Sequence, residues 1–228
     1  MVTTVEEEVL VFDLFGTLID TSAVTAALAA SMPGADAARL AAAWRAKQLE
    51  YTFRLTVMEQ YQDFDWVTAR ALEFALSAES RILEPQELAR LSGGYRYLDV
   101  FDDVAPGLAR LAATGRELVV LSNGSPAMLA GYAARPELAP WFTRWISVED
   151  VRAYKPSKRV YEHAAHLVMR PPEALRLISS NPFDLIGAKS AGMATAWINR
   201  SLGVFDPIGP APDVTVTNLT ALADIVGG

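Results

Sequence analysis

Short apolar runs that end in polar residues are the feature of this sequence that most constrains its fold. A run of this length without a polar side is typical of a strand buried on both faces of a parallel sheet. The runs lie at 9–12, 118–121, 145–148, 175–178, 195–198 and 214–216. Three of them deliver a polar residue to the end of the strand: Asp13, Ser122 and Ser179.

Amphipathic stretches with helical periodicity separate these runs. They lie at 107–113, 125–134, 157–169 and 183–191, and the Pro- and Gly-rich segment 203–213 is expected to be a loop. Alternation of strand and helix predicts an open α/β fold, with a central parallel sheet flanked by helices. In such sheets a ligand binds outside the carboxyl ends of the strands.

The spacing of the runs predicts a second unit. Ser122, Lys155 and Asp184 follow one another at about the roughly 30 residues that one strand–helix unit requires. The gap between Asp13 and Ser122 is far longer and is helical in pattern, at 23–30, 39–61, 66–78 and 85–95. We therefore expect a Rossmann-like core of residues 1–20 and 101–228, with a helical cap of residues 21–100 inserted after the first strand.

Composition excludes several classes of function. The 228 residues include no cysteine and only two histidines, so a disulfide framework, a thiolate site or a His-rich metal site is not expected. The net charge of −7 and the lack of a basic stripe argue against nucleic acid as a partner. No apolar run has the length of a membrane span, and segment 1–8 is acidic where a signal peptide would be basic. We expect a soluble, cytoplasmic protein that does not bind a membrane.

The carboxylate that follows the first run is the leading candidate for chemistry. Taken alone, an aspartate after a strand is more often a turn or cap residue than a nucleophile. The segment Asp13-Leu14-Phe15-Gly16-Thr17-Leu18 nevertheless resembles the first motif of the haloacid dehalogenase superfamily, in which the aspartate is the nucleophile.

Three further segments resemble the remaining motifs of that superfamily, in order. They are Leu121-Ser122-Asn123-Gly124, then Lys155-Pro156, then Ser179-Ser180-Asn181-Pro182-Phe183-Asp184. Alone, Lys155 would more often be a solvated surface lysine, and Ser179 and Asn181 would be ordinary turn residues. Four matches in order make coincidence improbable, and the resemblance covers essentially the whole chain.

Two departures separate the chain from the magnesium phosphatases of the superfamily. Those enzymes carry an acid two positions after the nucleophile, where this chain has Phe15, which cannot transfer a proton. They also carry an acid early in the fourth motif to hold Mg²⁺, where this chain has Ser179, Ser180 and Asn181. A halide needs no proton to depart, so an aromatic residue suits that leaving group.

The sequence of the predicted cap also favours a dehalogenase over a phosphatase. The segment Trp44-Arg45-Ala46-Lys47-Gln48-Leu49-Glu50-Tyr51 is similar to the cap signature of the L-2-haloacid dehalogenases. The segment from Lys155 to Tyr161 is similar to their third motif. Without that context, Arg45 would be read as a solvated helix residue and Tyr161 as part of the core.

The resemblance implies hydrolysis of short-chain 2-haloalkanoic acids, L-2-haloacids and haloacetates, to 2-hydroxy acids with inversion through an ester on the aspartate. The implied catalytic residues are Asp13, Thr17, Arg45, Lys155, Tyr161, Ser179, Asn181 and Asp184. The implied substrate-binding residues are Phe15, Arg45, Leu49, Phe64, Ser122, Asn123 and Phe183. No cofactor or metal is expected, and relatives imply a homodimer. The alternatives are a phosphohydrolase with an atypical metal site and a non-enzymatic interaction protein on the same fold.

Overall fold

The computed structural model describes residues 8–30 and 32–226, so most of the acidic segment 1–8 lies outside the described residues. Its centre is a parallel sheet in the order β3-β2-β1-β4-β5-β6. The strands are β1 (Val9–Phe12), β2 (Leu118–Ser122), β3 (Arg144–Ser147), β4 (Leu175–Ser179), β5 (Ala194–Ile198) and β6 (Val214–Val216). The α/β fold predicted from the sequence is confirmed, and each predicted apolar run overlaps a strand.

The first strand lies at the centre of the sheet. Val11 pairs in register with Val119 of β2 on one side and with Leu177 of β4 on the other. All four residues of β1 are buried. The residues that follow β1, β2 and β4 therefore meet at one edge of the sheet.

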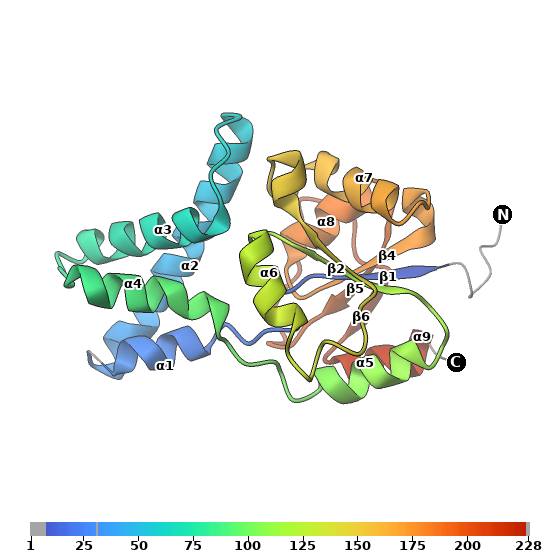
Figure 1. The fold of residues 1–228 in the computed structure, drawn as a ribbon, viewed down its shortest axis with the longest axis horizontal. Helices are drawn as coiled ribbons and strands as arrows, with labels where there is room; N and C mark the ends of the chain where they lie inside the picture. Colours follow the sequence, from blue (N-terminus) through green and yellow to red (C-terminus); the bar gives the residue numbers. More distant parts are fainter. Residues whose placement is uncertain (1–7, 31, 227–228) are drawn as a thin grey trace.

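Helices cover both faces of the sheet (Figure 1). They are α5 (Val104–Ala112), α6 (Pro126–Ala133), α7 (Lys158–Leu167), α8 (Pro182–Ser190) and α9 (Leu219–Val226), with short 3₁₀ turns η3 (Val148–Val151) and η4 (Pro172–Ala174). Figure 1 shows α7 and α8 on one side of the sheet and α5 and α9 on the other. The sequence reading did not predict α9, which begins after Asn218, whose side chain accepts a hydrogen bond from the amide of Ala221.

The third strand is displaced by one residue from the predicted run 145–148. It begins at Arg144 and ends at Ser147, whose hydroxyl oxygen accepts a hydrogen bond from the amide of Glu149. That bond starts the turn η3, so Val148 leaves the strand although its side chain is buried.

The long helical segment lies apart from the sheet, beyond the ends of its strands (Figure 1). It consists of α1 (Ala23–Ala29), α2 (Gly34–Val57), α3 (Phe64–Ala78), α4 (Pro85–Gly93) and the 3₁₀ turn η2 (Gly94–Arg96). The second helix begins five residues before the predicted 39, because Pro33 provides the extended residue that precedes a helix and Asp36 lies in its first turn. The indole of Trp44 donates to the carbonyl of Thr68 and joins α2 to α3.

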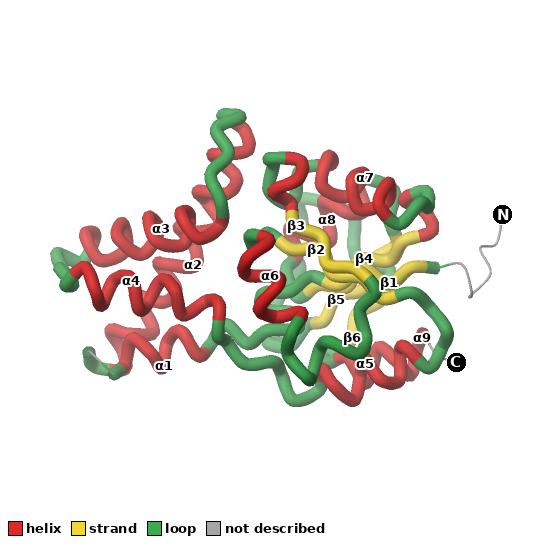
Figure 2. The backbone as a smooth tube through the Cα atoms, viewed as in Figure 1, coloured by secondary structure: helices red, strands yellow, loops and turns green. Residues whose placement is uncertain are grey.

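Loops connect the sheet to this helical segment (Figure 2). The loop after β1 leads into α1, and residues 97–103 lead back to α5. The predicted loop 203–213 contains no helix or strand. Among the described residues, no helix is both long and apolar enough to cross a membrane.

Candidate active site

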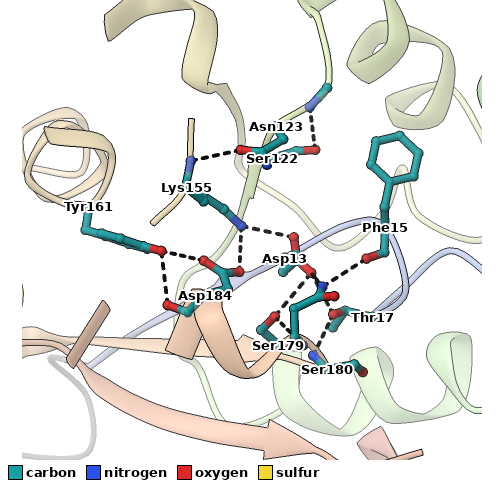
Figure 3. Close-up of polar contacts among 12 residues, drawn as sticks. Asp13, Phe15, Thr17, Ser122, Asn123, Lys155, Tyr161, Ser179, Ser180 and Asp184 are labelled. Atoms are coloured by element: carbon teal, nitrogen blue, oxygen red, sulfur yellow. Dashed lines mark hydrogen bonds and ion pairs between the residues drawn. The ribbon is translucent and has the colours of Figure 1, made fainter. Parts of the chain in front are cut away.

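Of the polar residues predicted at the strand ends, Ser179 reaches Asp13, which lies directly after β1, whereas Ser122 bonds to the amide of Gly124 (Figure 3). The chain turns sharply after Asp13, and Gly16 there has a φ of +83°, which favours glycine over other residues. This turn lets the backbone carbonyl of Phe15 accept a hydrogen bond from the side-chain Nδ2 of Asn181 at 3.2 Å. The loops after β1 and β4 are thus held together around the carboxylate.

One oxygen of Asp13 receives three neutral donors. The hydroxyl of Thr17 donates to Oδ2 at 2.8 Å, the Nδ2 of Asn181 at 2.8 Å, and the hydroxyl of Ser179 at 3.2 Å. Two of the donors are themselves held, because the Thr17 hydroxyl accepts from the amide of Ser180 and the Ser179 hydroxyl from that of Asn181. The Oδ2 atom is therefore fixed in a preorganised set of donors.

The other oxygen of Asp13 faces a buried cation. The Lys155 Nζ donates to Asp13 Oδ1 at 3.0 Å and to Asp184 Oδ2 at 2.8 Å. Tyr161 completes the group by donating its hydroxyl to Asp184 Oδ1 at 2.7 Å. The side chains of Lys155, Asp184 and Tyr161 are almost wholly buried, so these charges interact with little screening by solvent.

A glycine makes the approach of Tyr161 possible. A Cβ atom on Gly187, in the helix that begins just before Asp184, would lie 2.6 Å from the Tyr161 hydroxyl and 2.6 Å from Pro156. No side chain fits in that space. The absence of a side chain at Gly187 lets the tyrosine reach the Asp184 carboxylate.

Burial and neighbouring charges together raise the pKa values of Asp184, Lys155 and Tyr161. Burial raises the pKa of the Asp184 carboxyl, the charge of Asp13 raises it further, and the attraction of Lys155 with the hydrogen bond from Tyr161 only partly offsets this. Burial alone would lower the pKa of Lys155, but the two carboxylates outweigh it and the pKa is raised. Burial raises the pKa of Tyr161 well above its usual value, so its hydroxyl remains a donor.

The second motif contributes an oriented amide. The Oδ1 of Asn123 accepts a hydrogen bond from the backbone amide of Lys155 at 3.1 Å, so its NH₂ group is the part left to donate. The Ser122 hydroxyl oxygen accepts from the amide of Gly124 at 3.0 Å, which leaves its hydrogen to donate. Both residues therefore present donors on the side of the sheet where Asp13 lies.

A small cavity of about 10 Å³ lies over Asp13. Its walls come from the sheet and from the helical segment: Asp13, Phe15, Arg45, Phe64, Asn123, Lys155, Asn181 and Phe183. The sequence analysis expected Leu49 and Ser122 to line it as well, but neither side chain is among the lining residues. Leu49 lies beyond Arg45 along α2, and Ser122 is buried beneath the cavity wall at the end of β2.

An aromatic cluster supports the apolar wall. The rings of Phe15 and Phe64 are stacked with centroids 5.6 Å apart, and Tyr95 and Tyr132 meet the Phe15 ring edge-on. Phe183 on the opposite wall packs edge-on against Phe53 of α2. Phe15 thus packs the start of α3 and the turn η2 against the sheet, and it has no group that could transfer a proton.

A second, much larger cleft lies beside the cavity. It has a volume of about 730 Å³ and runs between helices α1 and α2 and the loops after β1 and β5. Among the lining residues the two spaces share only Arg45. Neighbouring residues such as Pro182 and Phe183 line the cleft and the cavity respectively, so the wall between them is thin.

Sequence reasoning missed the residues that join the helical segment to the sheet. The backbone amide of Tyr154 donates to the Thr56 hydroxyl at 3.0 Å, and its own hydroxyl donates to the carbonyl of Gln62 at 2.6 Å. The Ser125 hydroxyl donates to Asp65 at 2.7 Å. The one available signal was the position of Tyr154 directly before Lys155.

The donors around Asp13 do not fit a divalent cation. Two hydroxyls, an amide and an ammonium surround it, and the one further carboxylate, Asp184, is already bound to Lys155. A positive charge at that position would repel a metal ion, and Mg²⁺ prefers several hard oxygen ligands. Within residues 8–30 and 32–226 no group of three or more His, Cys, Asp or Glu side chains is arranged to hold a metal.

Comparisons of the chain with known proteins agree on one family. A family model described as haloacid dehalogenase-like hydrolase matches residues 7–192. An (S)-2-haloacid dehalogenase of Pseudomonas sp. (strain YL) is 36% identical over 94% of this chain and 92% of its own length. The haloacetate dehalogenase H-2 of Moraxella sp. (strain B) is 34% identical over 96% of this chain and 97% of its own length.

A solved structure extends the similarity to three dimensions. The L-2-haloacid dehalogenase of Xanthobacter autotrophicus with chloropropionic acid covalently bound superimposes with a TM-score of 0.89. It is 30% identical, and the match covers 97% of this chain and 98% of that protein.

The Tyr161–Asp184 bond gives a testable titration. The hydroxyl of Tyr161 stabilises the charged form of Asp184, so Tyr161→Phe removes an interaction that lowers the pKa. We expect the Asp184 carboxyl to titrate above its ordinary 3.8 in the unchanged protein and at still higher pH in Tyr161→Phe. The ¹³C chemical shift of the Asp184 carboxyl, followed against pH, measures both midpoints.

Tyr132→Phe is the matched control. Tyr132 is a buried tyrosine whose hydroxyl donates to the carbonyl of Tyr95, away from the charged group. Its substitution should leave the Asp184 midpoint unchanged. An Asp184 midpoint that does not rise in Tyr161→Phe would contradict the assigned hydrogen bond.

Proposed function

The chain belongs to the haloacid dehalogenase-like hydrolases, and on that premise we propose that it hydrolyses short-chain 2-haloalkanoic acids to 2-hydroxy acids. The substrates are L-2-haloacids and haloacetates, and the product is inverted at C2. The observation that carries the proposal is the environment of Asp13. One oxygen of this carboxylate accepts from three neutral donors, and the other lies beside a buried lysine. Two positions after Asp13, where a phosphatase of the superfamily has an acid, this chain has Phe15.

The first step is a displacement at carbon. Asp13 Oδ1 attacks C2 in line and forms a C–O bond, while the carbon–halogen bond breaks and the halide leaves with its electron pair. Arg45, the amide of Asn123 and the edge of Phe183 line the cavity and receive the halide. The departing halide needs no proton, which agrees with an apolar residue at position 15. The covalently bound chloropropionic acid in the Xanthobacter autotrophicus protein supports an ester of this kind.

The second step hydrolyses the ester. Water attacks Cγ of Asp13, and negative charge develops on Oδ2, where Thr17, Ser179 and Asn181 donate. Preorganised donors of this type stabilise a tetrahedral intermediate. The bond from Cγ to Oδ1 breaks as Oδ1 takes the proton that Asp184 received from the water, and the 2-hydroxy acid leaves. The new carboxyl of Asp13 loses its remaining proton to solvent, which restores the carboxylate. Asp184 holds Lys155 in place and accepts the proton of the attacking water.

Charge balance explains the need for Lys155. Asp13, Asp184 and the substrate carboxylate bring three negative charges into a nearly dry site, which would be very costly without a cation. Lys155 contacts two of them directly. Phe15 and Phe64 line the cavity and limit the size of the substrate.

We further propose that residues 21–100 act as a cap that closes over the site. Arg45 and Phe64 belong to this segment and line the cavity with residues of the sheet. A closed cap excludes water and strengthens the electrostatic interactions within. Tyr161 supports the site from α7 through Asp184.

Halide release tests the proposed function. Purified protein should release halide from L-2-chloropropionate and chloroacetate and not from D-2-chloropropionate, because Asp13 attacks from one fixed side. Exhaustive treatment with EDTA should leave the rate unchanged, since Lys155 supplies the positive charge. Hydrolysis of a phosphate ester that depends on Mg²⁺, without halide release, would overturn the proposal.

A labelled single turnover tests the ester. With excess enzyme in H₂¹⁸O, attack by Asp13 gives an unlabelled 2-hydroxy acid and leaves ¹⁸O in the peptide that contains Asp13. Direct attack of water on C2 would label the product at once. Mass spectrometry of the product and the peptide distinguishes the two routes, and labelled product in the first turnover would remove Asp13 from the role of nucleophile.

A homodimer formed through the cap is also proposed. On α3, Trp66 and Phe74 leave 42% and 45% of their surface exposed, and Tyr51 of α2 packs edge-on against Phe74. Large exposed aromatic residues favour an interface. Light scattering should give twice the mass of one chain, and Phe74→Glu should give the monomer. Ile225→Glu, at an exposed residue of α9, is the control and should stay dimeric.

A further inference from the structure

We infer that Gln48 is a positioning residue that holds Arg45 at the halide end of the cavity. The inference rests on the proposed function, in which Arg45 receives the halide. Gln48 does not line the cavity and so acts only through its contacts. A glutamine is not by its residue type a candidate for catalysis, and its role follows from its contacts in the structure.

The amide of Gln48 meets Arg45 inside the helical segment. Gln48 follows Arg45 by one turn of α2, and its side chain has no exposed surface. The Nη1 of Arg45 donates to the Oε1 of Gln48 at 2.6 Å. Hydrogen bonds that involve a charged group are short and strong, so this bond restrains a long and flexible side chain.

A relay of hydrogen bonds fixes which way the amide faces. The hydroxyl of Thr68 donates to the carbonyl of Phe64 at 2.6 Å, so its oxygen is left to accept. It accepts from the Nε2 of Gln48 at 2.7 Å. The NH₂ group must therefore face Thr68, and the carbonyl oxygen of Gln48 must face Arg45.

Arg45 also borders a second space, into which its side chain can turn. It stands in the wall between the small cavity and the 730 Å³ cleft, and Asp20 also lines that cleft. A guanidinium released by Gln48 is drawn toward water and toward this carboxylate. The hydrogen bond from Arg45 to Gln48 therefore selects the conformation that serves the reaction.

Helix packing alone does not account for a glutamine here. A buried amide costs free energy unless all of its groups are bonded. Trp44 already joins α2 to α3 by donating to the carbonyl of Thr68 at 2.8 Å, and apolar side chains would serve the contact as well. The side-chain carbonyl of Gln48 does not join the two helices; it accepts the hydrogen bond from Arg45.

Gln48→Met tests the inference. Methionine has a similar shape but no carbonyl acceptor, and Thr68 keeps its bond to Phe64. We expect kcat on L-2-chloropropionate to fall on the order of 10- to 100-fold, as for a misplaced catalytic group. KM should change little, because Arg45 interacts most strongly with the charge that develops on the departing halide.

A double-mutant cycle separates positioning from stability. Arg45→Ala alone should lower kcat on the order of 100- to 1,000-fold, the range for loss of a preorganised donor. In that background Gln48→Met should add less than about twofold, because the residue it positions is gone. The same factor in both backgrounds would overturn the inference while the proposed function stands.

Thr52→Val is the matched control. Thr52 is a fully buried polar residue one turn further along α2, and its hydroxyl donates to the carbonyl of Leu49. Its substitution should lower the melting temperature about as much as Gln48→Met and leave kcat within about twofold. A loss of kcat in Thr52→Val equal to that in Gln48→Met would show that Gln48 acts only through the stability of α2, and would overturn the inference.

A second measurement does not depend on turnover. In ¹⁵N-labelled protein the Arg45 guanidinium should rotate slowly and give resolved Nη signals, and Gln48→Met should remove them. Persistence of those signals in Gln48→Met would overturn the inference even in an inactive protein. Absence of halide release from the unchanged protein would instead overturn the proposed function.

Discussion

The buried ammonium of Lys155 between Asp13 and Asp184 is the interaction on which the rest of the site depends. Two carboxylates in a nearly dry cavity repel each other, and each loses its hydration. The lysine compensates both with one group, at 3.0 Å and 2.8 Å. Removal of Lys155 would leave two buried carboxylates with no cation between them, so both carboxylates depend on the lysine.

These three residues explain why the strand order matters. Asp13 follows β1, Asp184 lies in the first turn of α8 after β4, and Lys155 follows β3 and the turn η3. With β1 between β2 and β4, the loops that carry these residues meet at one edge. Parallel sheets with helices on both faces bury their strands, and the loops at this edge are the part free to hold polar groups.

The strand ends could be predicted from the sequence because the signal was local. An apolar run followed at once by Asp13, Ser122 or Ser179 places a polar group at the carboxyl edge whatever the rest of the chain does. The contacts of Gln48, Thr68 and Tyr154 could not be predicted, because each joins segments far apart in the chain and depends on how α2 and α3 pack. Leu49 shares a face of α2 with Arg45 but lies one turn further along it, and a helix signature does not predict where along the helix the cavity ends.

The two oxygens of Asp13 show how one carboxylate can serve two steps. Three neutral donors occupy the lone pairs of Oδ2, whereas Oδ1 accepts from Lys155 and keeps a lone pair for the attack. The neutral donors become most effective when charge appears on Oδ2 during ester hydrolysis. Lysine stays charged through both steps, because its raised pKa keeps the proton on Nζ. Attack from Oδ1 and stabilisation at Oδ2 therefore require no rearrangement of Asp13 between the steps, and the rigidity of β1 beneath it becomes an advantage for both.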